Sequence, residues 1–176
     1  FSDCLPAERI HNYQELNQLD PNVLINLSGE NIAARRWRPA QKRRLLASRV
    51  ELTEQLCHAS AQWPSLHTFI NASAIGVYGN GGDDQLSEAS PPGQGFSAEL
   101  CQRWENSARP QCRRIIARFA VVLDRDTKLG ALAKMRPAFA LGAGVVFGSG
   151  EQWQSYIHRH DAVQAIIFLM HSTSLI

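Results

Sequence analysis

Short apolar runs recur along the chain, and this recurrence constrains the fold more than any other feature. The runs are residues 21–29 (PNVLINLSG), 66–74 (LHTFINASA) and 112–123 (CRRIIARFAVVL). An uninterrupted apolar run of this kind is typical of a strand that is buried on both faces of a parallel sheet. We therefore expect three parallel strands in one sheet.

Helical patterns fill the two gaps between these runs. In the first gap, residues three or four positions apart form one stripe: Leu46, Val50, Thr53 and Cys57. In the second gap, a similar stripe consists of Leu100, Trp104 and Ala108. Because an amphipathic helix buries one such stripe, the sequence predicts strands that alternate with helices. This is the pattern of β-α-β units in an α/β fold.

The pattern changes after Leu123. A helical segment is predicted up to Pro137, and a glycine-rich stretch (GAGVVFGSG) follows at residues 142–150. A phosphate-binding glycine loop must leave a strand and open a helix, whereas this stretch follows a helix, so we interpret it as a turn. Asp161 is expected to cap a last apolar helix. This half of the chain is expected to lie above the sheet and to help close a pocket.

The composition excludes several classes of function. With 44% hydrophobic residues, 19% charged residues and a net charge of +2, the 176-residue chain is typical of one soluble domain. It lacks the basic face of a nucleic-acid-binding protein, and no apolar run is long enough to span a bilayer. The four cysteines include no C-x-x-C pair. We expect a cytoplasmic protein that binds neither nucleic acid nor membrane.

Two histidines, His158 and His160, would share one face of a strand and so raise the question of a metal site. A transition-metal site usually needs three or more converging ligands. The sequence offers no third ligand at a recognisable spacing, so no metal is expected.

Polar side chains near the ends of the first two runs are the candidates for a functional site. Open α/β sheets bind ligands at the carboxyl ends of their strands. Arg36 and Trp37 lie in the loop after the first run, where a guanidinium group would suit a phosphate or carboxylate. Ser73 is a candidate hydrogen-bond donor to a substrate oxygen, and Tyr78 either lines the pocket or anchors a turn.

Six motifs in order carry a resemblance to a known family: NVLINLSGENIAARRW, SRVELT, ASAIGVYG, FSAELCQRWE, VVLDRDTKLGALAKM and SYIHRHD. The chain resembles the epimerase-like branch of the short-chain dehydrogenase/reductase superfamily, and more narrowly its atypical NAD-dependent epimerase/dehydratase-like proteins. The resemblance implies a Rossmann-type, doubly wound parallel sheet, a bound NAD or NADP, and a small substrate-binding region near the C-terminus.

The resemblance also implies roles for particular residues. Those that match the cofactor-lining strand ends are Leu27, Ser28, Gly29, Asn71, Ala72, Ser73, Arg118 and Phe119. Those expected to face the substrate are Arg36, Trp37, Ser155 and His158. The catalytic candidates are Ser73 and Tyr78.

The sequence departs from the family in three respects. The Tyr-x-x-x-Lys pair of active members falls on Phe96 and Leu100, which can neither exchange a proton nor hold a ribose. The family's first strand with its glycine-rich loop, and most of the C-terminal substrate region, have no counterpart. We therefore expect a part of a longer protein, in which residues 1–123 form a partial NAD(P)-binding domain and residues 124–176 begin the substrate-binding portion.

Two functions fit these features. The first is an NAD(P)-dependent, nucleotide-sugar epimerase-like oxidoreductase that acts at a hydroxyl-bearing carbon. The second is a non-catalytic NADP(H)-binding sensor or scaffold. Loss of the Tyr/Lys pair favours the second, because general acid–base catalysis contributes about 100- to 10,000-fold in rate. In both cases the partner is a small molecule, and the sequence leaves open whether the protein forms a homodimer.

Overall fold

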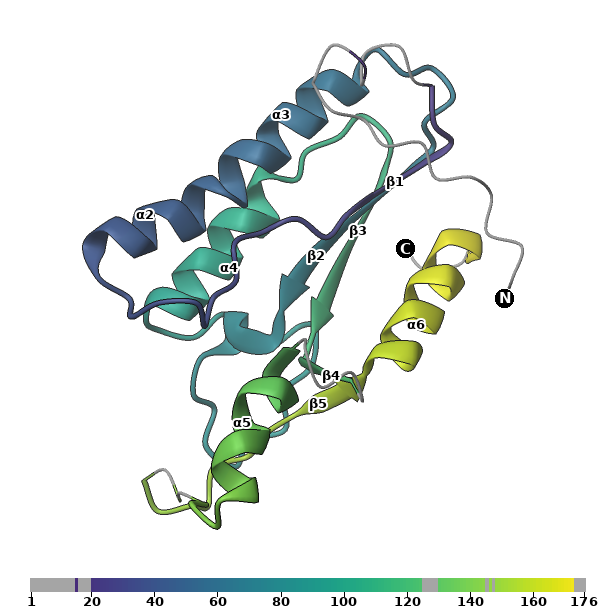
Figure 1. The fold of residues 1–176 in the computed structure, drawn as a ribbon. Helices are drawn as coiled ribbons and strands as arrows, with labels where there is room; N and C mark the ends of the chain where they lie inside the picture. The colour runs from purple at the N-terminus through teal and green to yellow at the C-terminus, as the bar shows by residue number, and fades with distance from the viewer. Residues whose placement is uncertain (1–14, 16–19, 125–129, 145, 147, 173–176) are drawn as a thin grey trace.

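The computed structural model describes residues 15, 20–124, 130–144, 146 and 148–172. Its main sheet consists of three parallel strands. Their order in the sheet is β1 (Val23–Asn26), β2 (Thr68–Ala74) and β3 (Arg113–Phe119), as seen in Figure 1. Each strand falls within one of the predicted apolar runs, and both strand pairs are parallel. The predicted α/β class is confirmed.

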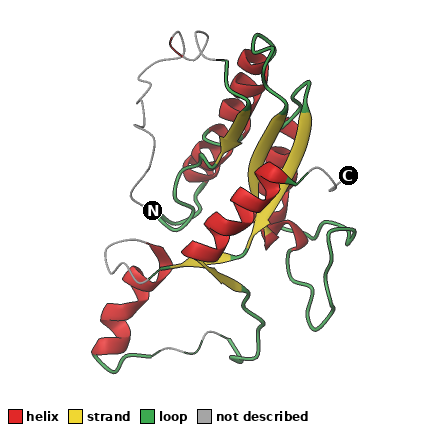
Figure 2. Cartoon of the chain, turned by 90° about the vertical axis from the view of Figure 1, so that its right-hand side faces the viewer, coloured by secondary structure: helices red, strands yellow, loops and turns green. Residues whose placement is uncertain are grey.

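Helices cover both faces of this sheet. On one face lie α2 (Pro39–Ala47), α3 (Val50–Ser60) and α4 (Phe96–Ser107). On the other face lies α6 (Arg159–His171), which contacts β2 and β3 (Figure 2). The arrangement is a three-layer, doubly wound one. In the described part of the chain, no helix is both long and apolar enough to cross a membrane.

A buried polar network joins the first two strands to the helices of the first layer. The Asn26 amide donates to Thr53 Oγ1 of α3 at 2.9 Å and to Asn71 Oδ1 of β2 at 2.7 Å. The Trp104 indole of α4 donates to the same Thr53 oxygen at 3.1 Å. A buried donor left without a partner costs about 1–3 kcal/mol. The network therefore favours one alignment of these strands and helices over any shifted one.

The prediction of one continuous helix between the first two strands is wrong. The chain forms two helices there, and Ser48 and Arg49 separate them. The Ser48 hydroxyl donates to the Leu45 carbonyl at 3.1 Å and accepts the Glu30 N–H at 3.0 Å. The Arg49 guanidinium donates to the Glu30 carbonyl at 3.0 Å. These hydrogen bonds hold the junction between α2 and α3 against the loop after β1. The spacing of apolar residues along a helix does not reveal such contacts.

The third predicted strand is also divided. After β3 and the single residue Ala120, the chain enters β4 (Val121–Leu123). This strand pairs in parallel with β5 (Tyr156–His158) in a separate two-stranded sheet. Because the apolar residues continue through the break, the run itself does not show that its last residues change partners.

Two expectations for the C-terminal part are wrong. The helix α5 (Gly130–Ala140) includes Pro137 and continues beyond it, although an interior proline lacks the N–H that would bond to the preceding turn. The N-cap of α6 is His158, whose Nδ1 accepts the His160 N–H at 3.2 Å, and Asp161 lies in the first turn instead. The glycine-rich stretch is indeed a turn region, since it connects α5 to β5 and no helix opens within its described residues.

Candidate functional site

Several of the predicted site residues gather at one edge of the main sheet. Leu27, Ser28 and Gly29 follow β1, Ser73 lies near the end of β2, and Arg118 lies near the end of β3. The strand register places Ser73 beside Arg118. The carboxyl ends of parallel strands form the ligand-binding edge of open α/β sheets. These positions therefore define the candidate site.

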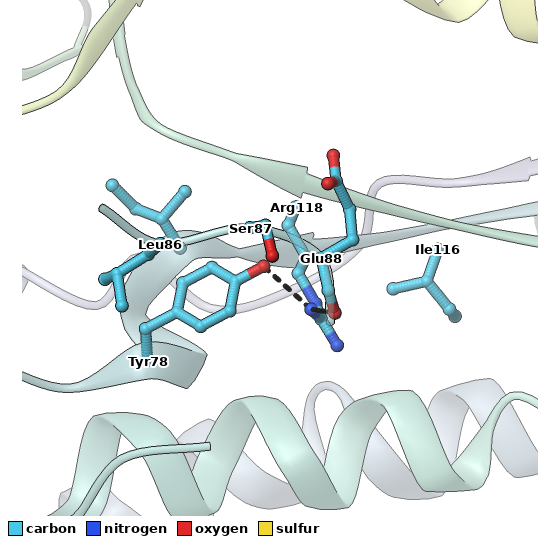
Figure 3. A pocket seen from close by; sticks show the side chains of 7 residues that line it. Tyr78, Leu86, Ser87, Glu88, Ile116 and Arg118 are labelled. Atoms are coloured by element: carbon cyan, nitrogen blue, oxygen red, sulfur yellow. Dashed lines mark hydrogen bonds between the residues drawn. The ribbon is translucent and has the colours of Figure 1, made fainter. Parts of the chain in front are cut away.

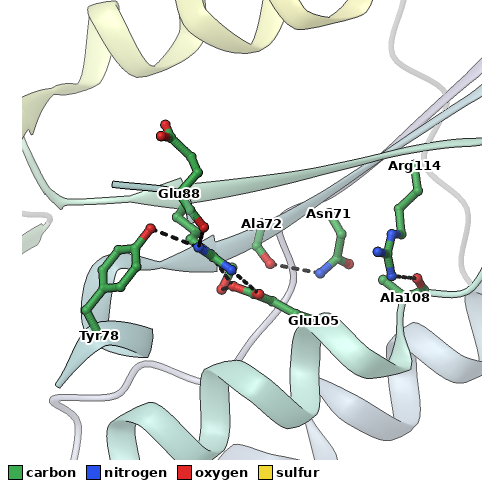
Figure 4. Close-up of polar contacts among 9 residues, drawn as sticks. Asn71, Ala72, Tyr78, Glu88, Glu105, Ala108 and Arg114 are labelled. Atoms are coloured by element: carbon green, nitrogen blue, oxygen red, sulfur yellow. Dashed lines mark hydrogen bonds and ion pairs between the residues drawn. The ribbon is translucent and has the colours of Figure 1, made fainter. Parts of the chain in front are cut away.

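The centre of the site is an ion pair between Arg118 of β3 and Glu105 of α4. Figure 4 shows Glu105 and Tyr78 among the polar contacts of this site. Arg118 donates from Nε to Oε1 and from Nη2 to Oε2 of Glu105, each at 2.8 Å. Burial acts to raise the pKa of the Glu105 carboxyl, but hydrogen bonds from Arg118 and Ser73 outweigh it and hold that pKa below its usual value. The bonds to Glu105 raise the pKa of the Arg118 guanidinium. Both groups are therefore charged at neutral pH.

Ser73 supports this ion pair from β2. Its hydroxyl donates to Glu105 Oε1 at 2.6 Å, and the residue is only 3% exposed. The hydroxyl proton is thus engaged by the carboxylate. Its neighbours in β2, Asn71 and Ala72, are buried as well, and the Asn71 amide donates to the Ala72 carbonyl at 2.8 Å. These side chains fix the strand end beneath the site.

Tyr78 extends the polar chain outward. It ends the 3-10 helix η1 (Ile75–Tyr78), which continues directly from β2. Its phenol oxygen accepts a hydrogen bond from Arg118 Nη1 at 2.8 Å, and the guanidinium carbon lies 5.2 Å from the ring centroid. The same Nη1 donates to the Glu88 carbonyl at 3.2 Å. Because the phenol accepts from Arg118, its own O–H remains available to a ligand.

A cavity of about 430 Å³ opens beside this chain. Figure 3 shows its lining, which consists of Ile75, Tyr78, Leu86, Ser87, Glu88, Ile116 and Arg118. Three aliphatic side chains in this lining stand beside four polar ones, which supply a phenol, a hydroxyl, a carboxylate and a guanidinium. Polar groups of these kinds suit a ligand that carries hydroxyl or carbonyl oxygens.

The positions that correspond to the missing Tyr/Lys pair are apolar. Leu100 is 1% exposed inside the helical layer. The Phe96 ring meets the edge of Trp37 at a centroid distance of 5.3 Å. Lys42 of α2 places its ammonium 4.8 Å from the centroid of the Phe96 ring. A cation therefore reaches the head of α4 from a neighbouring helix rather than from the position four residues along.

The remaining predicted residues lie elsewhere. The Trp37 indole donates to the Ile32 carbonyl at 2.9 Å, which holds the loop after β1. Ser155, just before β5, accepts the Val121 N–H through its carbonyl at 3.3 Å, and His158 ends β5 and caps α6. Neither is among the residues that line the cavity beside Tyr78. Phe119 ends β3, half-buried opposite Ala74.

Sequence reasoning missed Glu105. A signal was present, because Glu105 lies on the same face of α4 as Ala98 and Cys101, and both of these are buried. A carboxylate on the apolar stripe of a helix needs a charged partner inside the protein. Among the described residues, no group of three or more His, Cys, Asp or Glu could hold a metal ion.

A parallel sheet that is covered on both faces by helices and carries polar side chains at its carboxyl edge defines a Rossmann-type α/β protein. The chain belongs to the NAD dependent epimerase/dehydratase family, which its residues 7–175 match. The family indicated by the sequence motifs is confirmed.

Relatives of this chain are known from sequence and from structure. An epimerase family protein of Mycobacterium bovis is 40% identical over 96% of this chain and 58% of its own length. The human epimerase family protein SDR39U1, crystallised with NADPH, superposes with a TM-score of 0.83 at 29% identity, over 92% of this chain and 58% of that one. A nucleoside-diphosphate sugar epimerase of Corynebacterium glutamicum superposes with a TM-score of 0.75 at 30% identity, over 88% of this chain and 32% of that one. The chain thus spans about 58% of the length of the mycobacterial relative.

Proposed function

We propose that this chain belongs to an NAD- or NADP-dependent, epimerase-like oxidoreductase that acts at a hydroxyl-bearing carbon of a small polar substrate of the nucleotide-sugar class. The single observation that carries the proposal is the hydrogen bond between Tyr78 and Arg118 at the wall of the cavity. It pairs a phenol with a cation, as the superfamily's Tyr/Lys pair does. The human relative crystallised with NADPH supports the cofactor, and the Corynebacterium glutamicum relative named a nucleoside-diphosphate sugar epimerase supports the substrate class.

The loop after β1 fits a dinucleotide. Leu27 is 57% exposed, and Ser28 and Gly29 are exposed beside it at the carboxyl edge. A Cβ on Gly29 would lie 2.8 Å from the guanidinium carbon of Arg49, so a larger residue there would displace that side chain. We assign Leu27, Ser28 and Gly29, with the ends of β2 and β3, to the cofactor. When bound, a nicotinamide supplies the hydride acceptor or donor of the reaction.

Tyr78 is the proton carrier in this proposal. In the direction of carbonyl reduction, the Tyr78 O–H would transfer its proton to the substrate oxygen. The guanidinium of Arg118 stabilises the negative charge that is left on the phenol oxygen. In the direction of alcohol oxidation, the proton returns from the substrate hydroxyl to Tyr78. Ser73 and Glu105 act as positioning residues, because they hold Arg118 in place.

Turnover of NAD(P)H by the full-length protein tests this function. The protein is mixed with NADPH or NADH and a panel of nucleotide sugars and their keto forms, and the nicotinamide absorbance is followed. Tyr78→Phe should lower kcat by about 100-fold or more and leave cofactor affinity unchanged. Tyr156→Phe, at a position that is 70% exposed on β5, is the matched control and should behave as wild type.

A non-catalytic NADP(H) binder is the second candidate, and the apolar Phe96 and Leu100 favour it. The same experiment separates the two functions. If NADPH binds tightly but no member of the panel oxidises it, and Tyr78→Phe behaves as wild type, the protein is a non-catalytic binder and not an enzyme.

A further inference from the structure

A second hollow, of about 370 Å³, lies at the start of α2 and shares no lining residue with the cavity beside Tyr78. Its lining consists of Arg35, Arg36, Arg38, Ala40, Gln41 and Arg44. Four of these side chains carry a full positive charge at neutral pH. The chain as a whole has a net charge of only +2. The charge is thus concentrated at one place.

The four guanidinium groups have no protein partner in the part of the chain that the structure describes. Arginines such as Arg103, Arg118 and Arg159, in contrast, form ion pairs with carboxylates. One carboxylate is close by, that of Glu30, whose Oε1 accepts the Gln41 amide at 2.9 Å. Four like charges around one hollow repel each other, and an anion bound among them would offset that repulsion by attracting all four.

The start of α2 adds to the positive field. The helix begins at Pro39, with no side-chain cap and no acidic residue in its first turn. The first N–H groups of a helix have no partner within the helix and carry a partial positive charge. Ala40 and Gln41, which belong to this first turn, line the hollow. The backbone and the side chains therefore present the same sign of charge to one space.

We propose that this hollow binds a phosphate or diphosphate group of the small molecule that the protein holds. A guanidinium group donates two parallel hydrogen bonds to a phosphate or to a carboxylate. A phosphate or diphosphate can carry more negative charge than a carboxylate, and so suits four guanidinium groups better. The choice of a nucleotide ligand rests on the function proposed above. The phosphate could belong to the cofactor or to a sugar nucleotide, and the chemistry of the hollow is the same for both.

The position of the hollow supports a small ligand over a nucleic acid. The loop that carries Arg36 also carries Trp37, which contacts Phe96 at the head of α4. Arg36 therefore lies in the loop that follows β1 from the carboxyl edge of the sheet, where the candidate site lies. A nucleic acid would need a basic stripe over a whole face, whereas this charge is confined to one concave place.

Binding of phosphate compounds to the full-length protein tests the proposal. Calorimetric titrations with inorganic pyrophosphate, NADPH, NADH and UDP-glucose are carried out on wild type, Arg36→Gln, Arg44→Gln and Arg43→Gln. Arg43 is the matched control, because it is also exposed on α2 but does not line the hollow. We expect Arg36→Gln and Arg44→Gln each to weaken pyrophosphate binding about 10- to 100-fold, and Arg43→Gln to leave it unchanged.

The nucleotide arms identify the source of the phosphate. A loss confined to NADPH, with NADH unaffected, assigns the hollow to the cofactor's additional phosphate, and a loss confined to UDP-glucose assigns it to the diphosphate of the substrate. Equal losses in Arg43→Gln and Arg44→Gln would overturn the proposal, as would tighter binding of a single-stranded oligonucleotide than of pyrophosphate. If Arg36→Gln and Arg44→Gln bind pyrophosphate and the nucleotides as wild type does and turnover is intact, the phosphate-site proposal is wrong while the proposed function stands. Pyrophosphate binding without any binding of NADPH or NADH would remove the proposed function alone.

Discussion

Gly93 lies directly against the backbone of Tyr78, and a Cβ placed on Gly93 would overlap the Tyr78 carbonyl oxygen. The Gly93 N–H donates to the Val77 carbonyl at 2.9 Å. The close approach, not an unusual backbone conformation, requires glycine here, since Gly93 has no positive φ. The loop that precedes α4 thus packs tightly, through Gly93, against the turn that carries Tyr78.

Gly93→Ala should therefore displace Tyr78. The added methyl group overlaps backbone rather than a flexible side chain, and overpacking of this kind costs about 1–3 kcal/mol. Chemical denaturation should show a loss in that range, together with a fall in kcat. Gly144→Ala is the control, because its Cβ would meet only an ordinary contact, 3.4 Å from the Phe139 ring. Equal stability of both variants would contradict the proposed role of the contact.

Arg118→Lys should lose function although it keeps the charge. One ammonium group cannot hold both oxygens of Glu105 and also reach the Tyr78 oxygen. We expect the free energy of unfolding to fall by about 1–3 kcal/mol and kcat to fall with it. Arg103→Lys alters an exposed pair with Glu99 and should change stability by less than about 0.5 kcal/mol. A wild-type kcat in Arg118→Lys would exclude the guanidinium from catalysis.

Stability should depend on pH through Glu105. The pKa of this carboxyl is lower in the folded protein than in the unfolded chain, so its contribution is present above the unfolded value of about 4.3. That contribution disappears as the pH falls through the folded value. Glu105→Gln should be less stable than wild type at pH 7, and the difference should narrow on acidification below about pH 4. Denaturation curves across this range check it, with Glu99→Gln, in an exposed pair, expected to run parallel to wild type.

Restoring the superfamily's pair by Phe96→Tyr with Leu100→Lys should not increase turnover. Leu100 is 1% exposed, and an ammonium buried there without a partner should cost about 3 kcal/mol or more. Reacting groups also need near-attack geometry, which an apolar surrounding does not prepare. Thermal melting and the NADPH assay measure both effects, with Leu132→Lys, at an exposed position of α5, as the stability control. A more active double variant would contradict this prediction, because it would show that the site lacks only the Tyr/Lys pair.

The parallel sheet could be predicted from the sequence because its strands are uninterrupted apolar runs, and such runs are visible locally. The breaks could not. Ser48 separates α2 from α3 through a bond to Glu30, and Ala120 separates β3 from β4 through a change of pairing partner. Both depend on residues that are distant in sequence, so no local pattern records them.

The candidate site was predictable in place but not in composition. Ser73 and Tyr78 are polar residues near the end of an apolar strand, and the rule for open α/β sheets locates them. The link between them and Arg118 is Glu105, which comes from another element and is recognisable only once α4 packs on β2. Arg118 was assigned to the cofactor by family resemblance, whereas the structure bonds it to Glu105 and to Tyr78.

The single residue between β3 and β4 gives the site a mechanical linkage. Arg118 is fixed within the first sheet, yet Val121, three residues further on, is already paired with Tyr156 in the second. The backbone that positions Arg118, and with it the hydrogen bond to Tyr78, therefore adjoins the second sheet directly.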